Sequence, residues 1–114
     1  MSKLPIEYLK HIRDELVYLS NTSKGLSQNE FLQDEMLKRS FTRSIEIIGE
    51  AAKNLPINFR NNQSHIDWRS ISGMRDRLIH GYFGIDYDIV WDVVKNEVPV
   101  LKKEIEKLIL SINK

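Results

Sequence analysis

The sequence predicts an all-α fold, an up-and-down bundle of about five helices. Apolar residues recur at spacings of three and four along most of the 114 residues, which is the period of one face of an α-helix. No stretch alternates apolar and polar residues as a half-buried strand does. The connections are short, and short connections place successive helices antiparallel. A chain of this length is expected to form one domain over residues 1–114 that needs no disulfide or metal to hold it.

Two amphipathic helices are expected in the first half of the chain. The first begins at Pro5, a residue suited to a first helical turn, and ends near Asn21, where turn formers cluster. Residues 27–30 (SQNE) form a capping box, so a second helix starts there. This helix continues to Pro56, with a bend or short break near Asp34. The apolar stripes are Leu9, Ile12, Leu16 and Leu19, then Leu37, Phe41, Ile45, Ile48, Ala52 and Leu55.

A patch of small residues lies in the second of these helices. Gly49, Ala51 and Ala52 would let another helix approach closely, and this packing role is the favoured interpretation. Glu46 and Glu50, four residues apart, leave open a second interpretation, in which this face lines a cleft or a partner surface.

The second half of the chain begins with a polar segment. Residues 56–64 lack an apolar period and are expected to form the longest loop. Asp67 can then cap a third helix, which we expect to continue to Gly81. The residues that this helix turns inward are Trp68, Ile71, Met74 and Leu78.

Two further helices complete the expected bundle. Asp86 or Asp88 can start a fourth helix, which Asn96 and Pro99 should interrupt. Pro99 then opens a last helix with an apolar repeat over two heptads. The members of that repeat are Val98, Leu101, Ile105, Leu108 and Ile112.

Composition limits the classes of function. The chain has no cysteine, which excludes thiol chemistry and Cys-based zinc sites and fits a reducing compartment, so the cytoplasm is expected. The three histidines lack ligand spacing such as His-x3-His, and no metal or other cofactor is expected. No apolar run approaches the length of a signal peptide core or a membrane span.

The charge balance predicts that any site for nucleic acid is local. Seventeen basic and sixteen acidic residues give a net charge of +1. Arg69, Arg75 and Arg77 form a local basic cluster, which self-association would double. The other interpretation is that these arginines pair with carboxylates on a solvated face, and for Arg69 that pairing is favoured.

Residues 73–86 (GMRDRLIHGYFGID) hold most of the side chains suited to chemistry. On a helix, Arg75 and Tyr82 would share one face, and Asp76 and His80 would lie one turn apart and touch. Arg75 can hold a phosphate without losing its proton, and His80 can move a proton near neutral pH. Asp76 can orient the His80 ring and support its charged form.

This segment resembles the signature of HepT-like proteins, the toxin half of a bacterial pair formed by a HEPN protein and a minimal nucleotidyltransferase. The similarity includes the Arg75-x4-His80-x-Tyr82 motif. It extends to residues 43–53 (RSIEIIGEAAK) and 67–71 (DWRSI), and the chain length suits one such domain. The resemblance implies a HEPN-type bundle that forms a homodimer.

The resemblance also implies a function. It identifies the chain as the toxin of a type VII toxin-antitoxin pair, a metal-independent endoribonuclease that cleaves RNA where Arg75 and His80 of two subunits meet, with Asp76 beside them. A nucleotidyltransferase antitoxin would neutralise it by transferring AMP to Tyr82, in a complex that can be larger than the dimer. Many HEPN ribonucleases carry Asn at the position of Asp76, and a carboxylate there repels phosphate more strongly.

Two alternatives stay open at this point. In the first, the residues are structural: Arg75 and Asp76 form surface ion pairs, His80 caps a helix C-terminus and Tyr82 packs its ring. In the second, the bundle is a non-catalytic binding module that docks the nucleotidyltransferase and contacts nucleotide through Arg75 and His80.

Overall fold

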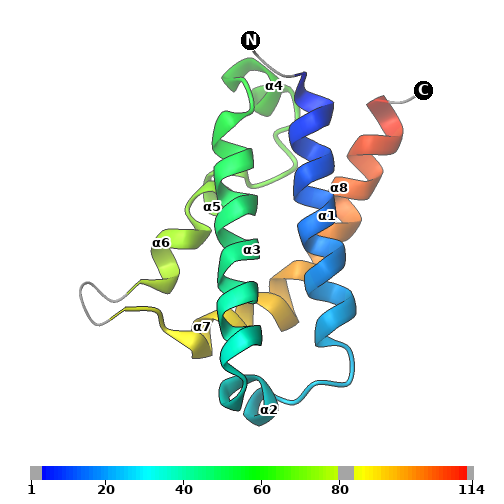
Figure 1. Ribbon diagram of the computed structural model, residues 1–114. Helices are drawn as coiled ribbons and strands as arrows, with labels where there is room; N and C mark the ends of the chain where they lie inside the picture. Colours follow the sequence, from blue (N-terminus) through cyan, green and yellow to red (C-terminus); the bar gives the residue numbers. More distant parts are fainter. Residues whose placement is uncertain (1–3, 80–83, 113–114) are drawn as a thin grey trace.

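The computed structural model describes residues 4–79 and 84–112, and its described part is a helical bundle built around three long helices (Figure 1). Helix α1 (Pro5–Ser23) lies between α3 (Glu35–Asn54) and α8 (Val98–Ile112) and runs antiparallel to both. The core lies where these three helices meet. All-α architecture is therefore confirmed. The fully buried core positions that the sequence predicted include Leu9, Ile12, Leu16, Leu19, Phe41, Ile45, Ile48 and Ile105.

The long helices bury one face and expose the other, as their amphipathic sequences predict. In α1, the residues between the buried Leu9, Ile12, Leu16 and Leu19 are exposed or half-buried. No helix in residues 4–79 and 84–112 is both long enough and apolar enough to cross a membrane.

The expected break near Asp34 is confirmed. Helix α2 (Gln28–Gln33) starts at the capping box, in which the Glu30 N–H donates to Ser27 Oγ at 3.1 Å and the Ser27 N–H donates to Glu30 Oε1 at 2.9 Å. Hydrogen bonds from the backbone and the side chain of Ser27 to the Glu30 carboxylate lower the pKa of Glu30. The backbone is extended at Asp34, whose carboxylate accepts the Leu37 N–H at 3.0 Å and so starts α3.

The expected loop over residues 56–64 is wrong. Helix α4 (Ile57–Asn62) occupies most of it, after Pro56 at the N-cap position. Its half-buried aromatic residue, Phe59, packs near Trp68 with ring centroids 6.5 Å apart. Six residues are too few to show a helical period in the sequence, and a tertiary contact supports the helix instead.

The expected third helix is present in two pieces. Its capped start is confirmed, and its course as one unbroken helix is not. Asp67 caps α5 (Trp68–Ser72) by accepting the Ser70 N–H at 3.0 Å, and α6 (Met74–Leu78) follows after Gly73. The backbone of Gly73, with φ −90° and ψ 1°, departs from the helical region and bends the chain between them. The four residues expected to face inward are all buried: Trp68, Ile71, Met74 and Leu78.

The expected interruption at Asn96 and Pro99 is wrong. Helix α7 (Tyr87–Asp92) starts at Asp86, whose carboxylate accepts the Asp88 and Ile89 N–H groups, and it continues through a π-helical turn, η2 (Val93–Glu97), into α8. In that turn the Val98 N–H donates to the Val93 carbonyl, five residues back. Pro99 has no N–H and crowds the carbonyl four residues before it, and a wider turn just ahead absorbs that conflict without ending the helix.

Phe31 joins α2 to the bundle, and its truncation should destabilise the fold. The ring is fully buried, stacks on Phe41 at a centroid distance of 5.0 Å and lies 5.4 Å from Trp91. Phe31→Ala should lower the free energy of unfolding by about 3–5 kcal/mol, because it leaves a cavity between three helices. Urea denaturation measures this loss. Met36→Ala, at a side chain that is 81% exposed, is the control and should change stability by less than about 0.5 kcal/mol. Equal effects of the two changes would contradict this account of how α2 is held.

Candidate functional site

Arg75 lies on the surface of α6, where an acidic residue of α3 holds it. Its Nε donates to Glu46 Oε2 at 3.0 Å, and its side chain remains 51% exposed. The two terminal nitrogens of its guanidinium make no hydrogen bond to the described residues. Arg75 is thus held through one nitrogen, and the other two have no partner among the described residues.

The contact between α3 and α5 explains why Glu46 and Arg75 meet. A Cβ atom added to Gly49 would lie 3.4 Å from the carbonyl oxygens of Ile71 and Ser72, so the two backbones approach closely at this glycine. The expected packing role of the small residues is confirmed at Gly49. Glu46 lies one turn before Gly49 and so faces α6, the helix that follows α5. The cleft interpretation for Glu46 and Glu50 is not needed, since Glu50 pairs with Arg43 at 3.6 Å.

The three arginines of the expected basic cluster have different environments. Arg77 makes a bidentate pair with Glu97, at 2.8 and 3.1 Å, and this hydrogen bonding raises its pKa. Arg75 pairs with Glu46, as described. Arg69 forms no ion pair with any described residue. The favoured expectation that Arg69 pairs with a carboxylate is therefore wrong for the described part of the chain. The expected cluster is therefore divided into one structural arginine, one weakly held arginine and one free arginine.

The helix that carries Arg75 ends earlier than the sequence predicts. Helix α6 stops at Leu78, and Ile79 is extended, with φ −99° and ψ 127°. Ile79 pairs with Ile85 in an isolated antiparallel bridge, and the Asp86 N–H donates to the Leu78 carbonyl at 2.7 Å. The expected continuous helix to Gly81 is therefore wrong at Ile79. The expected relations of Arg75 to Tyr82 and of Asp76 to His80 stay predictions. His80 and Tyr82 themselves lie outside the described residues.

Asp76 is exposed and next to Arg75 in α6. Of the four site residues predicted from the sequence, the structure describes Arg75 and Asp76 only. Glu46 is the site residue whose role the sequence left undecided. It lies 29 positions from its arginine, and no local spacing relates the two.

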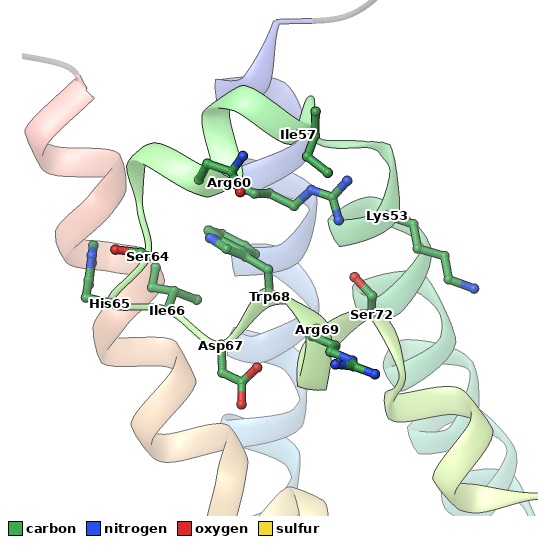
Figure 2. Close-up of a pocket in the computed structure, with 11 residues that line it drawn as sticks. Lys53, Ile57, Arg60, Ser64, His65, Ile66, Asp67, Trp68, Arg69 and Ser72 are labelled. Carbon is green, nitrogen blue, oxygen red and sulfur yellow. The ribbon is translucent and has the colours of Figure 1, made fainter.

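A cavity of about 700 Å³ lies elsewhere, among α4, the end of α3 and α5 (Figure 2). Neither Arg75 nor Asp76 lines it. The surface around Arg75 can bind an anion, since the guanidinium offers two nitrogens in a planar fork. An exposed ion pair such as that with Glu46 contributes at most about 1 kcal/mol, so a phosphate can compete for the arginine.

Comparison with known proteins assigns a family. Residues 6–108 match the family described as Ribonuclease HepT-like. A protein of Caldanaerobacter subterraneus subsp. tengcongensis named "Putative RNase" is 47% identical over 107 residues, covering 94% of this chain and 96% of that protein. A protein of Thermococcus cleftensis named "Probable ribonuclease HepT" is 38% identical over 102 residues, covering 90% and 93% of the two chains.

A third relative carries a similar sequence within a longer chain. A protein of Methanocaldococcus jannaschii named "Gamma-glutamylcyclotransferase and putative RNase" is 41% identical over 107 residues, which are 94% of this chain and 48% of that one. No solved structure matches this chain. The family match agrees with the helical bundle and with the resemblance seen in the motif, and so does the similarity to two relatives that are covered over nearly their whole length. The chain belongs to the HepT-like ribonuclease family.

Proposed function

We propose that this protein is an endoribonuclease that cleaves single RNA strands without a metal ion. The observation that carries the proposal is the state of Arg75, which is exposed, held by Glu46 through Nε alone and free to offer its two terminal nitrogens. A guanidinium presented in this way suits the non-bridging oxygens of a phosphodiester, whose charge increases in the transition state. Family membership supports the same class of reaction.

The proposed reaction is an attack by the RNA on itself. One His80 imidazole takes the proton of the 2′-hydroxyl, and the 2′-oxygen forms a bond to phosphorus as the bond from phosphorus to the 5′-oxygen breaks. A second imidazole, from His80 of the partner subunit, gives a proton to the departing 5′-oxygen. The products are a 2′,3′-cyclic phosphate and a 5′-hydroxyl. Arg75 stabilises the negative charge of the phosphorane between these two proton transfers.

The reaction needs two copies of the chain. One copy supplies a single His80, and the cavity described above does not include Arg75. A two-fold interface would bring Arg75 and His80 of both subunits to one phosphate. Homodimerisation is therefore part of the proposed mechanism.

Asp76 modulates this site in the proposal. Its exposed carboxylate adjoins Arg75 in the chain and offsets part of the positive charge that attracts RNA. The proposed site accordingly binds RNA less tightly than one with an uncharged amide at that position.

Regulation is proposed to act through Tyr82. A nucleotidyltransferase partner would transfer AMP to the phenol oxygen of Tyr82, releasing pyrophosphate from ATP. Because Tyr82 is close to Arg75 in the sequence, the new phosphate would compete with the RNA for the same positive charge. This chemistry gives the protein the role of toxin in a type VII toxin-antitoxin pair, acting on RNA in the cytoplasm.

Cleavage should persist in the presence of a chelator and depend on the two motif residues. His80→Ala should lower kcat/KM by about 10²–10⁴-fold, because it removes proton transfer. Arg75→Ala should lower kcat by about 10²–10³-fold, because it removes a stabilising donor. The assay follows labelled RNA and analyses the product ends for the cyclic phosphate. Arg39→Gln, an exposed arginine near the start of α3, is the matched control and should leave the rate unchanged. Loss of cleavage in chelator, or full activity of both motif variants, would refute the assigned site.

The active protein should be a dimer. Light scattering at micromolar concentration should give twice the mass of 13.4 kDa calculated for one chain. A mixture of the Arg75→Ala and His80→Ala proteins, allowed to exchange subunits, should contain mixed dimers that each retain one Arg75 and one His80. Because the proposed reaction uses His80 of both subunits, these mixed dimers should not recover full activity. A monomeric protein with full activity would remove the need for a shared site.

Tyr82→Phe should keep the fold and the ribonuclease activity but escape neutralisation. Without the phenol oxygen there is no acceptor for AMP at this position. After co-expression with the cognate nucleotidyltransferase, mass spectrometry should detect one or more AMP units on Tyr82 of the unaltered protein. A fully neutralised protein with unmodified Tyr82 would contradict this account of regulation.

A further inference from the structure

The cavity of about 700 Å³ has a cationic lining that the proposed cleavage site does not use (Figure 2). Lys53 comes from the last turn of α3, Arg60 from α4 and Arg69 from α5. None of these three side chains forms an ion pair or a hydrogen bond with any described residue. Arg13, Arg43, Arg75 and Arg77 each pair with a carboxylate. Three unpaired cations from separate elements thus line one cavity, in a chain whose net charge is only +1.

One carboxylate, that of Asp67, lines this cavity. It accepts the Ser70 N–H as the cap of α5, and in Figure 2 it points away from Arg60 and Lys53. It therefore does not neutralise these two cations. The lining has a positive excess, and this excess favours an anionic ligand.

Two polar atoms of the cavity lining have unsatisfied hydrogen-bonding capacity. Arg60 Nε and Ser72 Oγ are buried and have no hydrogen-bond partner within the described residues. Figure 2 shows the Arg60 guanidinium extending above Trp68 and the Ser72 hydroxyl pointing up toward it. Buried polar groups in folded proteins almost always have partners, so each such group calls for an explanation. An arginine nitrogen needs an acceptor and a serine hydroxyl can donate, and a phosphate oxygen satisfies both.

Trp68 fixes one wall of the cavity. Its side chain is buried, and its indole N–H donates to the Gln63 carbonyl at 3.1 Å. The ring is therefore held in place beneath Arg60. The volume lies within the usual range for small-molecule sites and exceeds what one phosphate fills, so it leaves space for the attached sugar or base.

The cavity lies along the same face of α3 as the proposed cleavage site. Lys53 follows Glu46 by seven residues, which is two helical turns, or about 10 Å along the axis. On the facing element, Ser72 precedes Arg75 by three residues. A strand whose phosphate contacts Arg75 can therefore continue along α3 into this cavity.

We propose that this cavity is a second phosphate subsite, which binds a neighbouring phosphate of the RNA strand held at Arg75. Lys53, Arg60 and Arg69 neutralise the phosphate, and Arg60 Nε and the Ser72 hydroxyl donate to its oxygens. This proposal rests on the proposed ribonuclease function and adds to it an anchor away from the scissile bond. The same chemistry would suit the phosphate of a free nucleotide, and the experiment separates the two sources.

The test compares two double variants that remove equal charge. Lys53→Gln with Arg69→Gln alters the exposed cations of the cavity, while Lys24→Gln with Arg39→Gln alters exposed cations at the opposite end of the bundle. Fluorescence anisotropy measures binding of a labelled single-stranded RNA whose 2′-hydroxyls are methylated, so that no cleavage occurs. The affinity of the cavity variant for this RNA should be lower by a factor of about ten or more, since the variant loses charge-assisted contacts. Its slope of log affinity against log salt should fall by about 0.7 for each lost phosphate contact on a single strand. The control should match the unaltered protein.

Substrate length gives a second readout. Cleavage of a dinucleotide, whose single phosphate occupies only the Arg75 site, should be unchanged in the cavity variant. For a longer RNA the variant should raise KM by a similar factor of about ten and leave kcat unchanged, because the lost contact acts away from the reacting atoms. A merely structural effect of the substitutions would alter both substrates alike and would overturn the proposal.

Three further outcomes also test the proposal. Equal RNA binding by the cavity variant and the unaltered protein would overturn the subsite. The variant could instead bind RNA normally but lose the binding of AMP or inorganic phosphate that titration detects in the unaltered protein. That result would assign the cavity to a free phosphate compound. If the protein binds RNA through the cavity but cleaves none, the subsite stands and the proposed ribonuclease function fails.

Discussion

The close approach of α3 and α5 at Gly49 positions both proposed sites of this protein. A hydrogen atom in place of a side chain allows the α3 backbone to lie against the carbonyl groups of Ile71 and Ser72. Glu46 and Lys53 are three and four residues from that glycine and so share its face of the helix. Glu46 then meets Arg75 of α6, and Lys53 reaches the cavity that α5 lines. A residue larger than alanine at position 49 would place further atoms against these carbonyl groups, push the two elements apart and alter both arrangements together.

The pairing of the basic residues matters more than their number. Arg77 is engaged on both sides of its fork by Glu97 and links α6 to the π-helical turn. Arg75 has one partner, the half-buried Glu46, in an ion pair at the surface, so a phosphate can compete with it at low cost. Lys53, Arg60 and Arg69 have no partner among the described residues and need give up no contact to bind an anion. A chain with almost no net charge can thus concentrate positive potential along one face of α3.

Short helices and irregular turns carry the candidate site residues, while the long helices carry the core. The chain bends at Gly73 and ends α6 at Leu78, and the bridge between Ile79 and Ile85 fixes both ends of the segment that holds His80 and Tyr82. Functional residues often lie on connections that a rigid scaffold holds in place. Here the scaffold is the α1, α3 and α8 core, which fixes α6 through the buried residues Met74 and Leu78.

By itself the sequence determined the helical class, the capped starts at Ser27 and Asp67, the break near Asp34 and most of the core, because these depend on periodicity and on hydrogen bonds between near neighbours. It also identified the motif and the family to which the chain belongs. Tertiary structure decided the features that depend on distant contacts. It formed α4 by packing Phe59 on Trp68, and it continued the last helix through Pro99 by a π turn. It ended α6 before His80 by pairing Ile79 with Ile85. It joined Glu46 to Arg75 across 29 residues and gathered Lys53, Arg60 and Arg69 around one cavity, since only the packing of α3 against α5 brings those positions together.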